Sequence, residues 1–483
     1  MHNAQRILLA VSCLLCLALL KYLWTTTLLN AGLAQSYGRL HVDKDGFVAC
    51  INPANASTEN PQQATTLTTS TSSHCADLNG LEDVAVILKT GSTEIYEKLP
   101  IHYTTTFSCI KDRLIYSDVQ QYFSGESIRD AIALISEQSR ALNDDLEEHE
   151  RLQYHVGIGG DASERRSDKS WRIDKWKFLP MISDSYKTFG DRKKWYFFIE
   201  ADTYVSLHNL LPWLSMLDHS QPIYAGAQVM IGHTEFGHGG SGFLLSSSAA
   251  RALSEIYNKD KLYWEGLVAQ DCCGDKIMAD VLVAADPPIR ILRSFPLIQG
   301  ETVASLDWTA THWCRPAVTW HHINPAGIDK MWQFEQRWRA EHGAHKPILF
   351  KDYYAAFVNP RIVAATNGKN VTLQAWDNLS NDWTFSSEST YSSTAQSCEQ
   401  FCKETQSCMQ WAWRPGSCRA GSKVRFGWAL KNRPELGSAG NRIEEFEGWE
   451  EAISGWLVGR IEEFKQVMGE CSTEEGRWVT KNE

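Results

Sequence analysis

The stretch WYFFIEADTYVSLHNLLPWL, residues 195–214, decides the fold class of this chain. Its first five residues are bulky and apolar and lack the spacing of an amphipathic helix. This predicts a strand buried on both faces, as in a parallel sheet covered by helices. The strand then ends at two acids, Glu200 and Asp202. Ligands of open α/β sheets bind beyond the carboxyl ends of the strands, so we expect these acids to face a cleft. The alternative interpretation is a surface turn with solvated acids.

Strand and helix patterns alternate on both sides of this stretch. Strands are expected over residues 83–91 and 113–118, and helices over residues 127–152 and 171–189. Such an alternation predicts an α/β layer fold with a mostly parallel central sheet. One domain of this class is expected over residues 80–345.

Length and charge bound the possible functions. The chain has 483 residues, which is too long for one compact core, so two or more domains with linkers are expected. The formal net charge is -11, and no long basic run is present. This balance argues against a surface that binds polyanions, so nucleic acid is not an expected partner.

An apolar segment near the N-terminus, residues 7–29, is long enough to cross a bilayer. Two interpretations stay open: an uncleaved signal anchor after a cytoplasmic tail at residues 1–6, or a signal peptide that is cut after Ala34. Apolar residues resume after Lys21, which favours the anchor. In either case the bulk of the chain would enter the secretory lumen.

Residues 30–79 are expected to form a stem rich in Ser and Thr. Residues 52–73 contain no aromatic residue and are too polar to bury a core. The sequons at Asn55, Asn370 and Asn378 are compatible with glycosylation in the secretory lumen.

The cysteines agree with that location. The chain has 13 cysteines, of which Cys13 and Cys16 lie in the apolar segment. An oxidising compartment would pair most of the others, and their odd number leaves one free or bridged to another chain.

A small module stapled by disulfides is expected over residues 384–430, after a connecting segment over residues 346–383. Zinc binding is the alternative, but a lumenal location and the lack of a nearby histidine favour disulfides. A C-terminal helical segment should follow over residues 431–483, with an amphipathic helix over residues 442–468. The module contains four cysteines within a short interval: Cys398, Cys402, Cys408 and Cys418.

Acids and histidines offer a metal site. Carboxylate oxygens bind hard divalent cations, and an imidazole can complete the ligand set for manganese. Glu200 and Asp202 supply the acids, and His321 and His322 follow an apolar, strand-like run. A cation held there could neutralise a nucleotide diphosphate. The alternative is that each histidine is an ordinary surface or hydrogen-bonded residue.

Two further segments carry candidates. Gly239 and Gly240 precede a strand and a helix, and glycines let a backbone pass close to a ligand, here a donor or acceptor sugar. Their spacing does not match phosphate or dinucleotide loops, and a structural tight turn is the alternative. Asp271 and Asp275 are candidates for a general base, although Asp275 could equally be an ordinary acid at a helix N-terminus.

Taken together, these segments resemble the fringe-like and core-1-type β-1,3-galactosyltransferases, in a fungal-type branch of glycosyltransferase family 31. The resemblance covers about residues 80–345 and rests on an ordered set of motifs: KTG, WRIDKWKFLPM, WYFFIEADTYV, HGGSGFLLS, CCGDKIMA and AVTWHH. It implies a GT-A fold, a UDP-sugar donor, Mn²⁺ and inversion at the anomeric carbon. It also implies a single-pass type II Golgi membrane protein with a lumenal catalytic domain.

The resemblance implies a metal site and a base. Asp202 matches the last acid of the D-x-D motif of the family and would bind the metal together with His321. Glu200 replaces the first aspartate and would contact the donor instead. Asp275 aligns with the catalytic base, and a second register leaves Asp271 in reserve.

The resemblance also implies pocket residues. Thr90 and Gly91 would line the nucleotide pocket, and Gly239 and Gly240 would shape the sugar pocket. The cysteine-rich module resembles a PAN or apple-like domain, which would bind a protein or a glycan.

The sequence thus predicts a metal-dependent, inverting glycosyltransferase. It would move a hexose or N-acetylhexosamine from a UDP-sugar to a glycan or glycoprotein, with a β-1,3 linkage expected. Glu200 stands in place of the first aspartate of the D-x-D motif. This change motivates the alternative, a catalytically inactive fringe-like fold that binds carbohydrate or protein. A glycosidase with two carboxylates would leave the paired histidines and the apolar segment unexplained.

Overall fold

A computed structural model describes residues 40–42, 48–50, 75–364, 371–430, 449–469, 471 and 478–481. The chain forms two compact units, Met1–Thr69 and Ser70–Glu483. In the first, β1 (Leu40–Val42) pairs antiparallel with β2 (Val48–Cys50). The expected membrane anchor and most of the stem lie outside the described residues. Among the helices that are described, none combines the length and the apolarity needed to cross a membrane.

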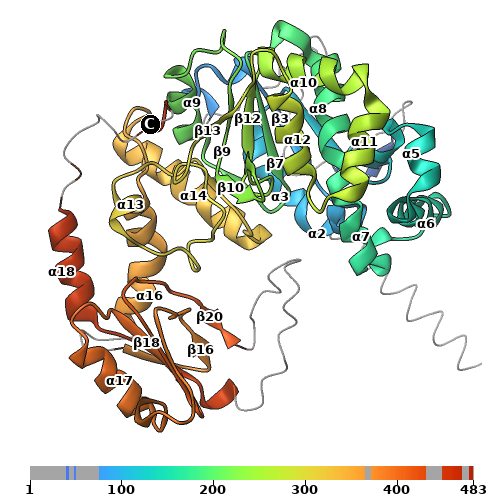
Figure 1. Cartoon of the computed structure of the whole chain (residues 1–483). Helices are drawn as coiled ribbons and strands as arrows, with labels where there is room; N and C mark the ends of the chain where they lie inside the picture. The colour runs from blue at the N-terminus through green and yellow to red at the C-terminus, as the bar shows by residue number, and fades with distance from the viewer. Residues whose placement is uncertain are drawn as a thin grey trace, which may run out of the picture. The chain divides into compact units, whose positions relative to one another are not determined.

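An eight-stranded sheet organises the second unit (Figure 1). Its order is β13-β9-β12-β7-β3-β4-β6-β5. The central strand β3 (Val84–Lys89) pairs in parallel with β7 (Trp195–Glu200) and β4 (Arg113–Ser117). Four of the seven pairings in the sheet are parallel, which confirms the mostly parallel α/β fold. The other strands are β5 (Gln121–Phe123), β6 (Glu126–Asp130), β9 (Tyr224–Gly226), β12 (Phe243–Ser246) and β13 (Ile291–Arg293).

Both faces of β3 and β7 are buried because successive side chains point to opposite sides. Phe197 packs into the hydrophobic core on one face, together with α9 (Leu207–Ser215) and α14 (Pro325–His342). Phe198 packs into the core on the other face, which is covered by three helices (Figure 1). These helices are α8 (Phe178–Phe189), α10 (Ser247–Lys259) and α12 (Gly274–Val283).

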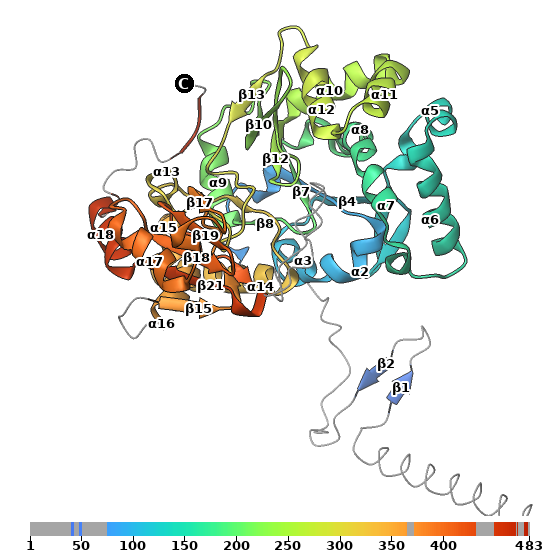
Figure 2. The same ribbon diagram turned by 60° about the horizontal axis from the view of Figure 1, so that its bottom comes forward.

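The remaining helices span between 4 and 11 residues each. Three of them, α5, α6 and α7, gather at one end of the unit in both views (Figures 1 and 2). Their bounds are α2 (Ile95–Lys98), α3 (Pro100–Thr104), α4 (Thr106–Cys109), α5 (Glu137–Leu142), α6 (Glu147–Gly157), α7 (Asp168–Arg172), α11 (Lys261–Gln270), α13 (Ala310–Trp313), α15 (Phe350–Tyr353), α16 (Asn359–Ala364), α17 (Ala395–Glu404) and α18 (Val458–Met468).

The helix predicted over residues 127–152 is wrong. Ile128 belongs to strand β6 and pairs with Ile115 of β4. The strand ends at Asp130, whose Oδ1 accepts hydrogen bonds from the backbone amides of Ile132 (2.8 Å) and Ala133 (3.0 Å). Pairing with a distant strand therefore overrides the local helical spacing, and helix resumes only in α5 and α6. The helix predicted over residues 171–189 is present as α8, which follows a 3₁₀ turn.

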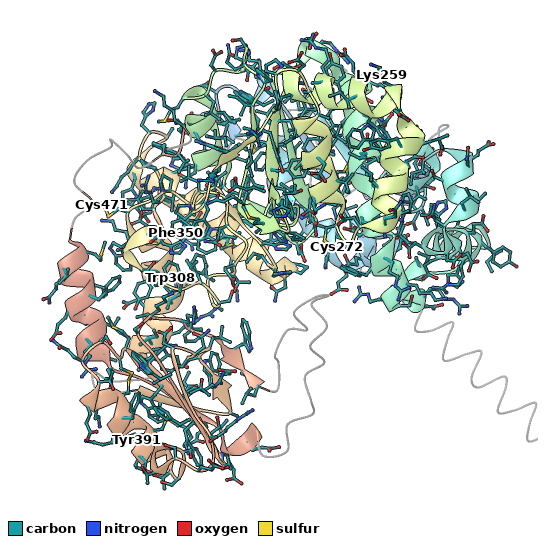
Figure 3. The ribbon with its side chains drawn as sticks, viewed as in Figure 1. Lys259, Cys272, Trp308, Phe350, Tyr391 and Cys471 are labelled. Carbon is teal, nitrogen blue, oxygen red and sulfur yellow. A yellow bond between two sulfur atoms is a disulfide. The ribbon has the colours of Figure 1, made fainter. Side chains whose placement is uncertain are left out.

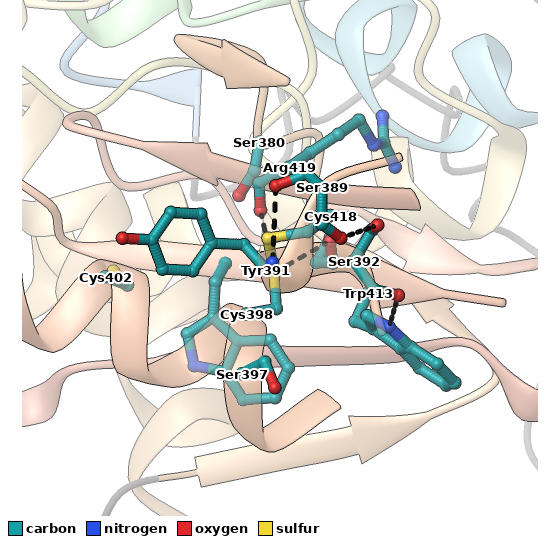
Figure 4. The surroundings of a disulfide bond; sticks show 12 residues. Ser380, Ser389, Tyr391, Ser392, Ser397, Cys398, Cys402, Trp413, Cys418 and Arg419 are labelled. Carbon is teal, nitrogen blue, oxygen red and sulfur yellow. Dashed lines mark hydrogen bonds between the residues drawn. A yellow bond between two sulfur atoms is a disulfide. The ribbon is translucent and has the colours of Figure 1, made fainter. Parts of the chain in front are cut away.

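A five-stranded sheet, in the order β15-β21-β18-β19-β17, forms the core of the C-terminal module. It extends beyond residues 384–430, because β15 and β21 come from either side of that interval. The disulfide Cys398–Cys418 joins α17 to β19 (Figure 4). The disulfide Cys402–Cys408 closes the loop that follows α17, so the four cysteines do not form a zinc site. The strands are β15 (Val371–Gln374), β17 (Trp383–Phe385), β18 (Gln410–Arg414), β19 (Ser417–Gly421) and β21 (Ile453–Trp456).

The amphipathic helix predicted over residues 442–468 is wrong at Ile453–Trp456. This strand, β21, pairs with β18 on one side and β15 on the other, and helix α18 begins only at Val458. A β-carbon on Gly455 would lie 2.4 Å from Cε2 of Trp411, so the strand packs closely against its neighbour. The sequon at Asn378 is also buried, and its Nδ2 donates to the backbone oxygen of Trp411 (3.0 Å). Asn378 is therefore not a glycosylation site in the folded chain.

The module is joined to the α/β domain within one hydrophobic core. Trp308, which is 1% exposed, donates its backbone N–H to Val424 O of the module (2.9 Å). Its ring packs against Trp320 of the α/β domain and lies beside Phe350 of the connecting segment (Figure 3). The disulfide Cys314–Cys471 adds a covalent connection.

Candidate active site

The candidate site begins at the carboxyl end of β7, where the chain turns sharply. Glu200 is the last residue of the strand and lies opposite Lys89 of β3. One hydrogen bond within the turn fixes it, because Thr203 N donates to Glu200 O (3.0 Å). A second comes from α3, where His102 Nε2 donates to Ala201 O (2.8 Å). The strand thus ends in a fixed loop rather than in a solvated turn.

A distant segment brings a histidine to this loop. Strand β14 (Thr319–Trp320) pairs antiparallel with β8 (Tyr204–Val205), which directly follows the acid pair. Ile323 N also donates to Asp202 O (2.9 Å). As a result, Nε2 of His321 lies 3.4 Å from Oδ1 of Asp202. The structure therefore brings together the two residues that the sequence analysis expects to share a cation.

His322 joins the cluster, although the resemblance assigns it no role. Its Nδ1 lies 3.9 Å from Oδ2 of Asp202, and its backbone adopts a left-handed conformation with φ of 55°. One ligand atom from each of Asp202, His321 and His322 lies within 4.8 Å of the others. The sequence contains this residue beside His321, but only the left-handed backbone turns both imidazoles toward one carboxylate.

The cluster fits a divalent cation. One carboxylate and two imidazoles form a donor set that suits manganese and related first-row metals. A β-carbon on Gly240 would lie 2.5 Å from Nε2 of His321, so this glycine leaves the room that the imidazole needs. Nδ1 of His321 is buried and has no hydrogen-bond partner among the described residues. The ring therefore presents Nε2, and not Nδ1, to its polar neighbours.

Asp202 stays ionised in this environment. Burial by itself would raise its pKa, but the nearby His321 and His322 rings and the charge of Lys98 outweigh that effect and hold the pKa well below its usual range. Lys98 Nζ lies 3.2 Å from Asp202 Oδ2. The carboxylate is thus available as an anionic ligand across the physiological pH range.

Glu200 is occupied by a different partner. Lys89 Nζ lies 2.9 Å from Oε1 of Glu200 and also pairs with Asp174. Burial opposes a charged Lys89, but the two carboxylates outweigh it and raise the pKa of the lysine. Oε2 of Glu200 lies 4.0 Å from Nε2 of His321, which is farther than Asp202. The geometry therefore favours Asp202 over Glu200 as the metal-facing acid.

The glycine run forms a turn against the same loop. Gly242 N donates to Gly239 O (3.0 Å), and Thr203 Oγ1 donates to Gly240 O (2.8 Å). Gly242 has φ of 86°, a left-handed conformation that favours glycine. The turn is therefore anchored to the end of β7 and contacts His321.

His238, immediately before the glycines, is a site residue that the sequence analysis missed. Its ring centroid lies 5.5 Å from that of His321, and Ser241 N donates to its Nδ1 (3.2 Å). Burial, and next the neighbouring His321, lower the pKa of His238 to about 4, so it is neutral. In the sequence, the one feature that indicates His238 is its position directly before the glycine run.

Asp275 lies at the other side of the glycine turn, in the first turn of α12. Its Oδ2 accepts a hydrogen bond from Gly239 N (2.8 Å), and its Oδ1 accepts one from Lys276 N (2.9 Å). Burial raises the pKa of Asp275 to about 6, although both amide donors favour the ionised form. A carboxylate with a raised pKa in such a position can accept a proton near neutral pH.

Asp271 is in a different environment. Its carboxylate accepts hydrogen bonds from Cys272 N (2.8 Å) and from Lys276 Nζ (2.8 Å). Burial alone would raise its pKa, but the Lys276 hydrogen bond and charge outweigh burial and lower it. Asp271 is therefore a weaker base than Asp275. The disulfide Cys272–Cys273 separates the two acids along the chain.

Thr90 and Gly91 follow β3 at the same edge of the sheet. Thr90 is buried, and its backbone N donates to Tyr116 O (2.9 Å) of the neighbouring strand β4. Its carbonyl accepts a hydrogen bond from Lys177 Nζ (2.8 Å). The same segment continues into α2, whose Lys98 reaches Asp202. The segment after β3 and the acid pair after β7 thus lie next to each other, and Lys98 connects them.

Comparison with known proteins covers the middle of this site. Residues 169–284 match the family model described as Fringe-like. The matched segment contains Asp202, the glycine turn and Asp275, whereas His321 lies beyond it. No curated protein matches the chain significantly. The PAN or apple-like resemblance of the C-terminal module stays a prediction.

The matched segment also contains strand β7 and the acid pair that follows it, which are part of the motif set that resembles family 31 galactosyltransferases. The α/β fold that surrounds the matched segment is consistent with GT-A, as the resemblance implies.

Proposed function

We propose that this protein is a divalent-metal-dependent, inverting glycosyltransferase that moves a hexose or N-acetylhexosamine from a UDP-sugar to a glycan or glycoprotein hydroxyl. A Fringe-like domain indicates a glycosyltransferase with a nucleotide-sugar donor and a glycan acceptor. We also propose that the enzyme requires a divalent metal, uses a UDP-linked donor and forms a β-1,3 linkage.

One observation carries the proposal. Two consecutive glycines contact two different candidates: Gly239 N donates to Asp275 (2.8 Å), and a β-carbon on Gly240 would touch the imidazole of His321 (2.3 Å). A candidate base and a candidate metal ligand thus lie on either side of one glycine turn. A transferase needs this arrangement, because the acceptor hydroxyl and the donor diphosphate meet at one carbon atom.

Asp202 and His321 would hold the cation, with His322 as a further donor. When bound, the cation would supply positive charge for the diphosphate and stabilise the departing UDP. Asp202 is prepared for this role because its carboxylate is ionised. Glu200 would contribute indirectly, since Lys89 holds it beside the cluster (2.9 Å).

Asp275 would act as the general base. An inverting transfer needs one group to take the proton from the acceptor hydroxyl as the new bond forms. The two backbone hydrogen bonds to Asp275 fix the direction of its carboxylate. Its buried position keeps bulk water away from the carboxylate and raises its affinity for a proton.

Release of UDP from a panel of UDP-sugars, measured with and without Mn²⁺, is the direct test. We expect Mn²⁺ to stimulate release by at least one donor. Asp202→Ala and His321→Ala should each lower the rate by about 100-fold or more, because charge stabilisation supplies much of such catalysis. The matched control is Asp218→Ala: Asp218 is exposed, and its carboxylate accepts hydrogen bonds from Ser220 and from no residue of the cluster, so this variant should keep the activity. Full activity of Asp202→Ala would refute the metal site.

The second candidate is an inactive binding protein with the same fold. It is motivated by the ion pair between Glu200 and Lys89, which occupies the first acid of the pair. Calorimetry with UDP and Mn²⁺ separates the two candidates. A transferase should bind UDP in a metal-dependent way, and an inactive binder should not.

We further propose a lumenal Golgi location as a single-pass type II protein, with a glycan or protein ligand for the C-terminal module. Five disulfides among the described cysteines support an oxidising compartment. Fluorescence microscopy of the tagged full chain together with a Golgi marker tests the location, and cytosolic fluorescence would contradict it.

A further inference from the structure

The ammonium group of Lys98 competes for the carboxylate that the proposed metal site needs. Its Nζ lies 3.2 Å from Oδ2 of Asp202, while Nε2 of His321 lies 3.4 Å from Oδ1. One oxygen of Asp202 therefore contacts a lysine and the other contacts an imidazole. A divalent cation at this carboxylate would lie next to a charged lysine unless the lysine moved.

Lys98 has a second partner that would let it move without losing all of its pairing. Oε1 of Glu94, one turn earlier, lies 3.0 Å from the same ammonium. The lysine side chain keeps 23% of its surface exposed, so it is not locked in the core. Burial opposes its charge, but Asp202 and Glu94 outweigh burial and raise its pKa, so Lys98 is charged at neutral pH.

Lys98 lies near the segment that the resemblance assigns to the nucleotide pocket. It ends α2, the short helix that follows Thr90 and Gly91 at the carboxyl end of β3. The diphosphate of a nucleotide-sugar is anionic and gains further negative charge as the sugar leaves. An ammonium group is an effective partner for such a phosphate.

We propose that Lys98 neutralises Asp202 in the metal-free protein and binds the donor diphosphate in the loaded protein. This inference rests on the function proposed above. In the exchange Lys98 leaves Oδ2 of Asp202 and keeps its contact with Glu94. No proton is transferred, since the lysine is charged in both states.

The exchange has a signature that a purely structural lysine would not produce. Removing the ammonium should strengthen the binding of Mn²⁺ alone, by about tenfold, because one positive charge no longer competes for Asp202. The same change should weaken UDP binding at saturating Mn²⁺ by about tenfold or more, because a charge-assisted contact to phosphate is lost. The two affinities therefore change in opposite directions.

Calorimetry on the full chain measures both affinities, first with Mn²⁺ alone and then with UDP at saturating Mn²⁺. Lys98→Met is the main variant, and Lys98→Gln is a second one in case the first does not fold. Lys98→Arg keeps the charge and should bind both probes within about threefold of the wild type. Glu94→Gln, which keeps Lys98 but removes its other partner, should stay within about threefold as well.

Opposite changes in the two affinities support the proposal. Unchanged affinities in a folded Lys98→Met or Lys98→Gln chain, or tighter Mn²⁺ binding with unchanged UDP binding, overturn it. Failure of the proposed function is distinguishable, because the wild type itself would then show no metal-dependent UDP binding, and the role of Lys98 would fall with it.

Discussion

Gly240 and His321 are in direct steric contact: a β-carbon on Gly240 would lie 2.3 Å from Cε1 of the imidazole. The glycine therefore sets the position of the histidine that faces Asp202. This contact links the glycine turn to the candidate metal site, although Gly240 has no side chain to contribute.

Gly240→Ala should displace the His321 ring and weaken Mn²⁺ binding. A contact below 3.0 Å cannot be kept, so either the ring or the turn must shift. We expect Mn²⁺ affinity to fall by about tenfold or more, because a ligand displaced by an ångström no longer fits the site. Calorimetry with Mn²⁺ checks this expectation.

Gly266→Ala is the matched control for that variant. Gly266 lies in α11, and a β-carbon there would meet no atom within 4 Å. This change should leave Mn²⁺ binding intact and stabilise the helix by about 0.5–1 kcal/mol. Equal Mn²⁺ affinities for the Gly240→Ala and Gly266→Ala chains would contradict the role assigned to Gly240.

The pH dependence of transfer should report the ionisation of Asp275. Only the ionised carboxylate accepts a proton, and burial raises its pKa to about 6. Turnover at saturating Mn²⁺ and donor should therefore rise with pH, reach half of its maximum near pH 6 and level off about one pH unit higher. A pH–rate profile measures this limb.

Asp275→Asn should remove that limb and lower turnover by about 100-fold or more, since a positioned base contributes this much. Asp271→Asn is the control, because Lys276 holds the carboxylate of Asp271 (2.8 Å) and lowers its pKa. A profile that loses its acid limb in Asp271→Asn, but keeps it in Asp275→Asn, would reverse the assignment of the base.

Trp308→Ala should destabilise the α/β domain and the C-terminal module together. The indole is 1% exposed and packs against Trp320 (6.2 Å) and Tyr354 (5.3 Å between ring centroids). Its truncation should lower the free energy of unfolding by about 3–5 kcal/mol. Chemical denaturation measures the loss.

Trp171→Ala removes the same side chain from an exposed position, where the residue is 52% exposed. It should change the free energy of unfolding by no more than about 0.5 kcal/mol. Similar losses in both tryptophan variants would show that Trp308 does not join the two parts of the unit.

Replacing both Cys272 and Cys273 by serine should affect turnover but not metal binding. Their disulfide constrains the turn that leads into α12, and Asp275 lies in the first turn of that helix. A less constrained base should lower turnover by about tenfold, because small misplacements of catalytic groups are costly.

Mn²⁺ and UDP affinities of that double variant should match the wild type, since Asp202 and His321 lie on other segments. A matched loss of Mn²⁺ affinity and turnover would contradict this separation. Serine at Cys402 and Cys408, whose disulfide lies in the C-terminal module, is the control and should leave turnover unchanged.

Some elements were predictable because their signal is local. Residues 195–199 of the strand are apolar on both faces, and no amphipathic helix has that pattern. Ile128 has helical spacing to later isoleucines, but it pairs with β4, so the helical pattern over residues 127–152 does not hold in the fold. Ile453–Trp456 likewise forms a strand because it pairs with β15 and β18. Hydrogen bonds to a partner strand stabilise these segments as strands. The spacing of apolar residues within a segment carries no information about that distant partner.

The buried strand, its two terminal acids and the chemical types of the candidate metal ligands follow from residue identity and short-range spacing. The meeting of Asp202 with both histidines and Lys98 depends instead on the folded sheet. The tertiary structure also distinguishes the buried Asp275 from the lysine-paired Asp271. Distances between side chains, their burial and their ion pairs depend on segments that lie more than a hundred residues apart in the sequence and that the sheet brings together.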